Sequence, residues 1–201
     1  MTQILHGAMH SAYLHLYMIL MMMMMMMTKA RKKVQLFLAG QVCELGCGPG
    51  LPSLTAAKKG AEVIATDIDE IALEMVEAAA KEQGYLVDNR FRTQKFDLTS
   101  RQTSDLPDAD LYILSDVFES GTVAEGAAFH VQSLLSKNNS NKSNQRRRVW
   151  VFAQSDRAQR DSFLNIMKQT YDESLEWSTQ SPHLNRELWL FDLDETIVNY
   201  N

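Results

Sequence analysis

The chain has few cysteines and no excess of positive charge, and each of these deficits excludes a class of protein. Two cysteines in 201 residues exclude a disulfide-built scaffold. A general nucleic-acid binder would usually be basic, whereas the net charge here is −5, so we expect no specific nucleic-acid partner. With 45% apolar and 22% charged residues, the chain is neither disordered nor fibrous. Its length suits one domain, or one domain plus a tail.

The first 28 residues lack charge altogether. Ten of the twelve methionines lie there, seven of them consecutively at 21–27. Residues 12–27 fall short of the roughly 20 apolar residues that span a membrane. Residues 2–20 contain no Lys or Arg, which argues against a signal peptide. We therefore predict that residues 1–33 are a Met-rich leader and basic linker, either a disordered tail or a misassigned start; a short membrane anchor and a targeting segment are the alternatives.

Residues 34–201 read as one domain in which strands alternate with helices, a pattern typical of a layered α/β fold with a mostly parallel sheet. We expect strands at 41–45, 62–66, 91–96, 111–114, 149–153, 175–178 and 187–191. We expect helices at 51–59, 70–83, 122 to about 135, and 156–169. The short connection between the last two strands permits only an antiparallel pair, so the C-terminal strand is predicted to be antiparallel.

Finer expectations concern the helices and the longest polar stretch. Apolar side chains recur at Ile71, Met75 and Ala78 or Ala79, which predicts the buried face of the helix at 70–83. Thr122 and Glu125 fit a capping box that opens the next helix. Residues 136–148 are almost wholly polar, with five positive charges, and are expected to form a surface loop.

The most informative motif is V-C-E-L-G-C-G-P-G at 42–50, where a strand ends, glycines recur and a helix begins. Glycines let a ligand approach bare backbone, and the helix N-terminus supplies N–H donors. The dinucleotide fingerprint would place its third glycine at Leu51. Instead the acid Glu44 precedes the first glycine by two residues. A carboxylate repels a pyrophosphate but suits a cationic amine, so the motif favours an amino-acid-like cofactor over NAD.

Asp67 follows the second strand and is expected to bind a ribose. In a doubly wound sheet an acid at this tip lies beside the glycine loop and can accept both ribose hydroxyl protons. The alternative is that Asp67 caps the following helix. Asp69 is available for that capping role.

The run V-C-E-L-G-C-G-P-G-L-P-S-L-T-A-A-K-K-G-A-E-V-I-A-T-D-I-D-E-I-A-L at 42–73 resembles the cofactor-binding half of class I S-adenosylmethionine-dependent methyltransferases. The later F-D-L-T-S at 96–100 and L-Y-I-L-S-D-V-F-E-S at 111–120 resemble the nicotinamide N-methyltransferase-like group, which includes many protein-lysine methyltransferases. The resemblance covers residues 34–192. It implies a Rossmann-like sheet of seven strands, mostly parallel with an antiparallel C-terminal strand and with helices on both faces.

The resemblance also implies a role for each matching residue in binding S-adenosyl-L-methionine. Glu44 and the loop from Gly46 to Gly50 would hold the methionine end, Asp67 the ribose, and Asp97 the adenine amine. The remaining residues of the implied cofactor set are Cys47, Gly48, Leu51, Ile68, Leu98 and Ser115. A simpler reading of Asp97 is that it caps the turn after it. Cys43 and Cys47 are expected to be reduced thiols, and no metal site is expected.

Asp116, at the end of the fourth strand, is implied to lie beside the sulfonium of the cofactor and to orient the methyl acceptor, with help from Glu119. The simpler reading is a solvated loop acid. Lysine methyltransferases of this group place Tyr or Phe three residues after the acid, whereas Phe118 here comes one position early. Phe118 either packs beside the substrate or belongs to the core. Since an amine must be neutral to attack a methyl group, water or a carboxylate must remove its proton.

The resulting hypothesis is an S-adenosylmethionine-dependent methyltransferase that modifies nitrogen on a protein side chain of the lysine type. A small-molecule N-methyltransferase is the alternative enzyme, and a cofactor-binding interaction module without catalysis is the alternative outside enzymes. We expect a monomer in the cytoplasm, with the nucleus as a further compartment. Membrane association would require the leader to be an anchor.

Overall fold

The structure is a computed structural model and describes residues 40–140, 147–153, 156–171, 176–177 and 188–192. Its strands are β1 (Gln41–Leu45), β2 (Glu62–Asp67), β3 (Phe91–Lys95), β4 (Leu111–Ser115), β5 (Arg148–Ala153) and β6 (Leu188–Asp192). Its helices are α3 (Leu51–Lys58), α4 (Glu70–Glu82), α5 (Gly121–Ser140) and α6 (Arg160–Thr170), with a 3-10 turn, η1, at Val87–Asn89. The predicted leader lies outside the described residues. No helix in the described part of the chain is both long and apolar enough to cross a membrane.

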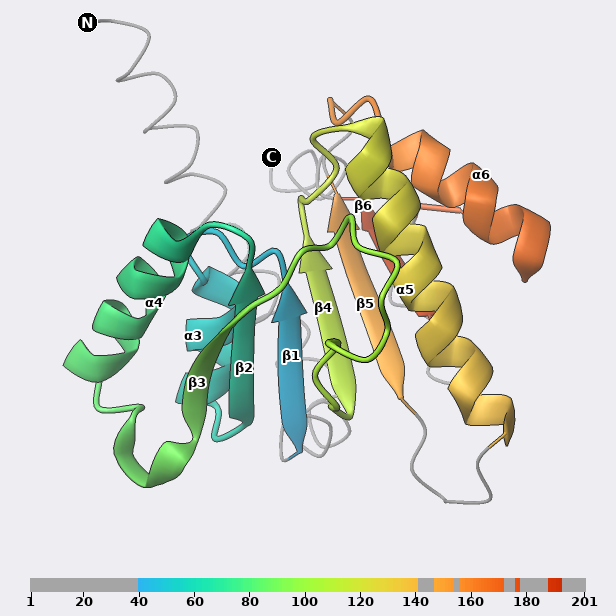
Figure 1. The fold of residues 1–201 in the computed structure, drawn as a ribbon. Helices are drawn as coiled ribbons and strands as arrows, with labels where there is room; N and C mark the ends of the chain where they lie inside the picture. The colour runs from blue at the N-terminus through green and yellow to red at the C-terminus, as the bar shows by residue number, and fades with distance from the viewer. Residues whose placement is uncertain (1–39, 141–146, 154–155, 172–175, 178–187, 193–201) are drawn as a thin grey trace, which may run out of the picture.

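All six described strands are parallel and lie in the order β3-β2-β1-β4-β5-β6 (Figure 1). The chain proceeds from β1 outward to β3 and then returns to place β4 on the other side of β1. At that reversal Leu45 pairs with Thr66 on one side and with Leu114 on the other. Parallel strands end at the same edge of a sheet, and ligands bind where the strand order reverses. The fold therefore gathers the segments that follow β1, β2 and β4.

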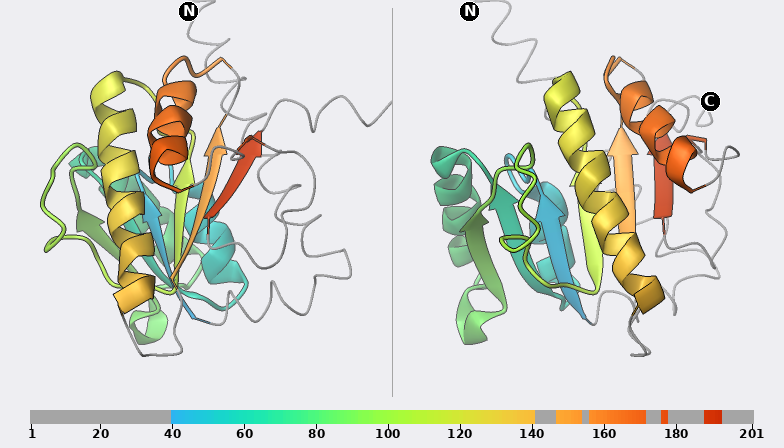
Figure 2. Two further views of the ribbon diagram at one scale, coloured as in Figure 1. Left: turned by 90° about the vertical axis from the view of Figure 1, so that its right-hand side faces the viewer. Right: turned by 45° about the vertical axis from the view of Figure 1, so that its right-hand side comes forward.

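Each face of the sheet is covered by its own pair of helices (Figure 2). Val42, Val63 and Ile113 point to the face that α3 and α4 cover, and they pack there with alanines of both helices. Cys43, Ile64, Tyr112 and Leu114 point to the opposite face and pack against α5 and α6. Successive strand residues thus alternate between two buried layers, which explains why the strands read as nearly continuous apolar runs.

The C-terminal part of the sheet differs from the prediction. The expected antiparallel strand is wrong, because β6 pairs in parallel with β5, with Val149 opposite Leu188. The prediction depended on an intervening strand at 175–178. Of those residues the structure describes Glu176 and Trp177, and neither is in a strand. Without that strand, α6 serves as the helical crossover that a parallel pair requires. The described sheet therefore has six strands rather than seven.

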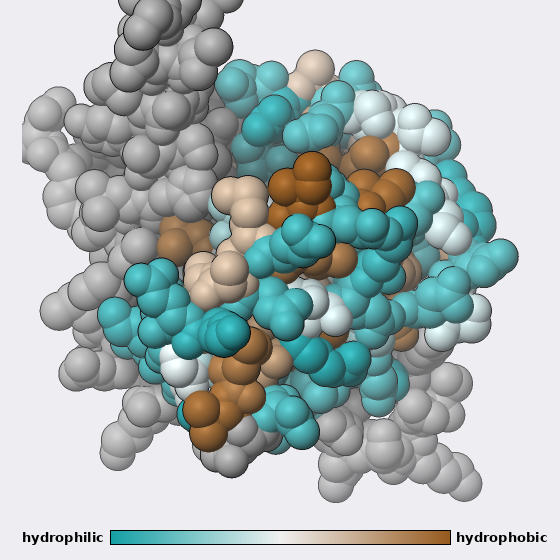
Figure 3. Space-filling model, turned by 60° about the vertical axis from the view of Figure 1, so that its left-hand side comes forward, coloured by the Kyte–Doolittle hydropathy of each residue, from teal (hydrophilic) through white to brown (hydrophobic). Residues whose placement is uncertain are grey.

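The buried face of α4 is also not the predicted one. Leu73, Val76 and Ala80 are buried, whereas Ile71 and Met75 are 67% and 61% exposed. Both sets recur at helical spacing, so periodicity could not choose between them. Apolar side chains accordingly interrupt the polar surface on the side of the molecule that carries α4 (Figure 3).

The start of α5 corrects the predicted capping box. The helix begins at Gly121, and Ser120 caps it: Val123 N–H donates to Ser120 Oγ at 3.3 Å, and Ala124 N–H donates to the Ser120 carbonyl at 3.0 Å. Glu125 instead forms an ion pair with Arg101. The helix also runs on to Ser140, into the stretch that was expected to be loop. Polar residues do not prevent a helix from continuing once its apolar face is anchored.

Gly50 offers a test of the packing between α3 and α4. It has a φ of +72°, and a Cβ there would overlap the side chain of Val76. Gly84 has a φ of +75° with no atom within 4 Å of such a Cβ. Both Gly→Ala variants should lose about 1 kcal/mol of unfolding free energy to backbone strain, and Gly50→Ala should lose at least about 1 kcal/mol more to overpacking. Urea unfolding measures both losses; equal losses would contradict the predicted contact.

Candidate functional site

One cavity of about 510 Å³ opens at the carboxyl edge of the sheet, beside β1, β2 and β4. Twelve of the predicted site residues line it: Glu44, Gly46, Cys47, Gly48, Leu51, Asp67, Ile68, Asp97, Leu98, Ser115, Asp116 and Glu119. They come from four separate strand ends and their following loops. The tertiary structure therefore unites segments that are more than 70 residues apart in the sequence.

The glycine loop forms one wall of this cavity. Cys47 N–H donates to the Thr66 carbonyl at 2.8 Å, and Gly50 N–H donates to the Cys47 carbonyl at 2.7 Å. These bonds hold the loop between β2 and the start of α3. Gly48 lines the cavity, and a Cβ added there would meet nothing within 4 Å. The loop thus leaves open space next to backbone, where a ligand can approach it.

Glu44 is the buried acid of the cavity, with only 1% of its surface exposed. Its Oε2 accepts the Ser53 N–H at 2.9 Å and the Ser53 hydroxyl at 2.5 Å. Its Oε1 has no partner among the described residues. Burial raises the pKa of Glu44 to about 8 even though both Ser53 bonds act to lower it. A cationic group bound beside Oε1 would favour the ionised carboxylate.

Asp67 links the end of β2 to the glycine loop. Its Oδ2 accepts the Gly48 N–H at 2.8 Å, and its Oδ1 accepts the Asp69 N–H at 2.9 Å. Each carboxylate oxygen retains a further lone pair for a ligand hydroxyl. Asp69, not Asp67, caps α4, because its side chain accepts the Ile71 N–H at 2.9 Å.

Asp97 shapes the turn that follows β3. Its Oδ1 accepts two bonds from Thr99, from the backbone N–H at 2.8 Å and from the hydroxyl at 2.7 Å. The hydroxyl bond is the main reason why the pKa of Asp97 lies below its usual value. The capping alternative for Asp97 is therefore observed. It leaves Oδ2 without a partner among the described residues, so capping does not preclude a second role.

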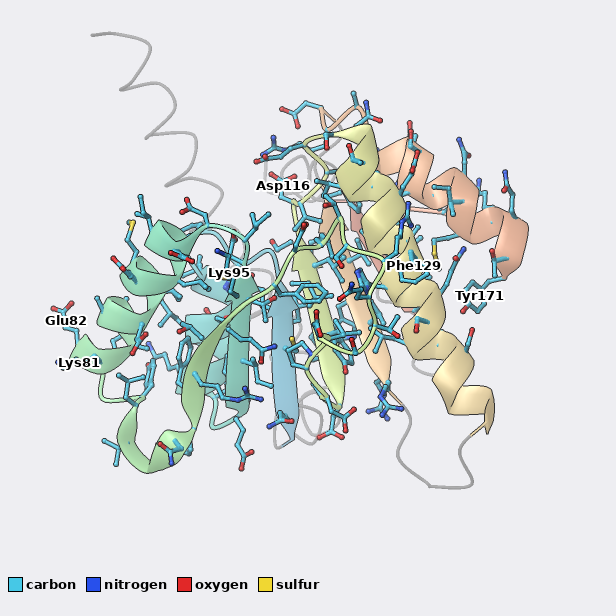
Figure 4. The ribbon with its side chains drawn as sticks, viewed as in Figure 1. Lys81, Glu82, Lys95, Asp116, Phe129 and Tyr171 are labelled. Atoms are coloured by element: carbon cyan, nitrogen blue, oxygen red, sulfur yellow. The ribbon has the colours of Figure 1, made fainter. Side chains whose placement is uncertain are left out.

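Asp116 lies at the carboxyl end of β4, at the upper edge of the sheet in Figure 4. Its φ is +56°, a conformation that few non-glycine residues adopt. Its Oδ2 accepts the Arg157 Nε–H at 3.0 Å and an Arg157 Nη2–H at 2.6 Å. The Asp116 side chain is only 8% exposed, which is not the environment of a solvated loop acid. Its charge is therefore balanced by a guanidinium that also lines the cavity.

Two predicted residues do not line the cavity. Phe118 is 1% exposed and packs against Phe163 and Trp177, with ring centroids 5.1 and 6.0 Å away. Of the two readings of Phe118, the structure therefore favours the core. Gly50 is buried against Val76 and acts at the start of α3.

Arg157 is the functional candidate that the sequence analysis missed. It follows β5 and precedes α6, in residues that the periodicity assigned to the helix. The sheet topology could have indicated it. Because β5 is parallel to β1 and β4, the segment after β5 begins at the same edge of the sheet as the segments after β1 and β4. Hydrogen bonding to Asp116 is the main cause that raises the pKa of Arg157 above its usual value.

Two further groups of residues bear on the described part of the site, the cysteines and the metal-ligating residue types. Cys43 and Cys47 are both buried free thiols, and burial is the main cause that raises the pKa of each. No cluster of three or more His, Cys, Asp or Glu residues suited to a metal ion occurs within the described ranges.

The buried carboxyl of Glu44 predicts a pH-dependent stability. Because folding raises its pKa from 4.5 to about 8, the folded state retains a proton that the unfolded chain releases. Stability should therefore fall as the pH rises through that window, by at most about 1.4 kcal/mol per pH unit. Glu44→Gln keeps an acceptor for Ser53 but cannot ionise, so it should lose this component. Urea unfolding of both proteins without ligand, at pH 5 and pH 8, measures the difference; parallel pH profiles would contradict the assignment.

Comparison with known proteins finds a protein-family profile that matches part of the chain. The profile described as a methyltransferase domain matches residues 42–133, from β1 into α5. No curated protein matches the chain.

Solved structures show only distant similarity. TehB from Haemophilus influenzae is 18% identical, with 45% of this chain and 32% of TehB covered and a TM-score of 0.36. Coclaurine N-methyltransferase bound to N-methylheliamine and SAH is 19% identical, with 55% and 32% covered and a TM-score of 0.42. A TehB-like SAM-dependent methyltransferase from Corynebacterium glutamicum is 19% identical, with 65% and 64% covered and a TM-score of 0.44. The chain thus spans about a third of the length of the first two.

The part of the chain that the profile matches begins in β1 and includes the glycine loop, Asp67, Asp97 and Asp116. Over these residues the chain is similar to a methyltransferase domain.

Proposed function

We propose that this protein binds S-adenosyl-L-methionine in the cavity at the carboxyl edge of the sheet and transfers its methyl group to a nitrogen atom. The observation that carries the proposal is that a single cavity contains the glycine loop, Asp67, Asp97 and Asp116. These are the positions that sequence resemblance assigns to the cofactor and to the methyl acceptor.

The polar groups that line the cavity fit the successive parts of the cofactor. Glu44 Oε1 is a buried acceptor suited to the ammonium group, and the open backbone at Gly48 leaves room for the amino-acid end. Asp67 would accept the ribose hydroxyl protons. Asp97 Oδ2 would accept from the adenine amine, with Ile68 against the ring. When bound, the cofactor supplies an electrophilic methyl group on a sulfonium.

The Asp116–Arg157 pair would act on the acceptor. An amine beside Asp116 can donate an N–H to the carboxylate and so be held with its lone pair in line with the methyl group. The guanidinium of Arg157 disfavours the protonated form of the same amine, because like charges repel. The pair would therefore orient the nucleophile without holding it as an ammonium ion, and water at the exposed Glu119 side would carry the proton away.

We propose a lysine-type protein side chain as the acceptor, with a small-molecule amine as the second candidate. The first is supported by the resemblance of residues 111–120 to the group that includes protein-lysine methyltransferases. The second is supported by two features of this chain, the displaced aromatic at Phe118 and the neutralisation of Asp116 by Arg157. A cofactor-binding module without catalysis is the third outcome that experiments must separate. Placement in the cytoplasm, or also the nucleus, and a monomeric state remain predictions.

Cofactor binding should depend on Asp67 and not on its neighbour. Calorimetry should detect S-adenosylhomocysteine binding to the full chain, and Asp67→Ala should reduce the affinity at least 100-fold, because it removes the ribose acceptor and the bond to Gly48. Asp69→Ala is the matched control: it removes the α4 cap but should leave the affinity within twofold. Unchanged binding in Asp67→Ala would overturn the cofactor assignment.

The acceptor should be identifiable with labelled cofactor and whole-cell lysate. A labelled protein band supports the protein substrate, and label confined to small molecules supports the second candidate. Asp116→Asn is the control, since Asn tolerates the positive φ and keeps an acceptor for Arg157. It should reduce labelling about 100-fold while leaving S-adenosylhomocysteine binding within a few fold. Binding without any label would favour the non-catalytic module, and undiminished labelling by Asp116→Asn would overturn the role of Asp116.

A further inference from the structure

The turn from Asp97 to Ser100 forms one side of the cavity, but its internal hydrogen bonds do not fix its position in the fold. Asp97, Leu98 and Thr99 all line the cavity. The bonds from Thr99 to Asp97, and the bond from the Ser100 N–H to the Asp97 carbonyl at 3.0 Å, all lie within the turn. They fix its shape and leave its position to other contacts.

Those contacts come from α5, along which the connection after β3 runs (Figure 1). His130 Nε2 lies 2.7 Å from the Ser100 carbonyl oxygen. One turn earlier, a Cβ at Gly126 would overlap the Leu98 carbonyl, so the helix backbone itself touches the turn. Beyond the turn, Arg101 donates to the Glu125 carbonyl at 3.0 Å. Three neighbouring positions of α5 therefore hold this segment.

His130 is the one side chain of α5 that bonds directly to the turn, among the residues described here. It is fully buried between Phe96 and Phe129, with ring centroids 5.1 and 5.3 Å away, and Phe129 is marked on α5 in Figure 4. A carbonyl oxygen only accepts, so Nε2 must carry the proton. Its Nδ1 is buried and has no partner in the described part of the chain. The imidazole is thus committed to a single hydrogen bond.

We infer that His130 is a positioning residue for the adenine end of the cofactor. The inference rests on the proposed S-adenosylmethionine function. By donating to the Ser100 carbonyl, His130 fixes the position of the turn. The position of the turn then determines whether Asp97 Oδ2 can accept from the adenine amine. His130 contacts no reacting group itself. Its effect should therefore appear as recognition of the base, not as general affinity.

The test compares two ligands that differ only at that amine. The purine riboside analogue of S-adenosylhomocysteine carries a hydrogen atom where S-adenosylhomocysteine carries the amino group, so it cannot donate to Asp97. Calorimetry on the full chain should show that the native protein prefers the adenosyl ligand at least tenfold, the value of one hydrogen bond to a charged acceptor. His130→Leu keeps the apolar packing but removes the donor, and it should reduce the preference to twofold or less, mainly by weakening the adenosyl ligand.

Matched variants separate positioning from packing. His130→Gln retains an N–H donor of similar reach and should restore most of the preference. Leu134→Ala opens a cavity one turn along α5, where the side chain is 1% exposed, and should lower stability but keep the preference. If His130→Leu does not fold, Gly126→Ala carries the test, because its Cβ must displace Leu98 and should lower the same preference.

The outcomes are distinct. Equal weakening of both ligands in His130→Leu, with the preference intact, would overturn the positioning role while leaving the proposed function standing. A preference lost in Leu134→Ala as fully as in His130→Leu would also overturn it. Failure of the native protein to bind S-adenosylhomocysteine would remove the proposed function and this inference with it.

Discussion

The parallel pairing of β1 with both β2 and β4 is the constraint on which the site depends. Because every described strand runs the same way, each loop that follows a strand emerges at one edge. Because the strand order reverses at β1, the loops after β1 and β4 diverge toward opposite faces and leave space between them. The glycine loop lines that space from one side and Asp116 from the other. An antiparallel β1 or β4 would send one of these segments to the opposite end of the molecule.

Charge is distributed unevenly around the cavity. Among the described residues that line it, five carry carboxyl groups, Glu44, Asp67, Asp97, Asp116 and Glu119, and one, Arg157, carries a guanidinium. Each of the four deeper acids is tied to a protein donor: Glu44 to Ser53, Asp67 to the glycine loop, Asp97 to Thr99 and Asp116 to Arg157. These hydrogen bonds hold the four carboxyl groups in place, and the excess of acids over bases among the described lining residues is compatible with the cationic ligand proposed above.

The local elements were largely predictable because their signals are local. The strands at 41–45, 62–66 and 149–153 and the helix at 51–59 match the structure within a residue, since apolar runs, Gly60 and Pro52 mark their limits. The errors arose where local signals were degenerate. The helix at 70–83 carries two sets of apolar side chains at helical spacing. Only the packing of Leu73, Val76 and Ala80 against α3 and the sheet selects the buried set. The last strand was given the wrong direction because a strand was assumed at 175–178.

The sequence by itself determined the α/β alternation, the glycine loop and the acids at or near the carboxyl ends of β1, β2, β3 and β4. These depend on residue type and on spacing within about ten positions. Only the tertiary structure decided that Phe118 lies in the core, that Arg157 neutralises Asp116, and that His130 holds the turn of Asp97. The Arg157–Asp116 and His130–Ser100 contacts join residues 41 and 30 positions apart. No local pattern encodes them, because sheet topology and helix packing alone bring such residues together.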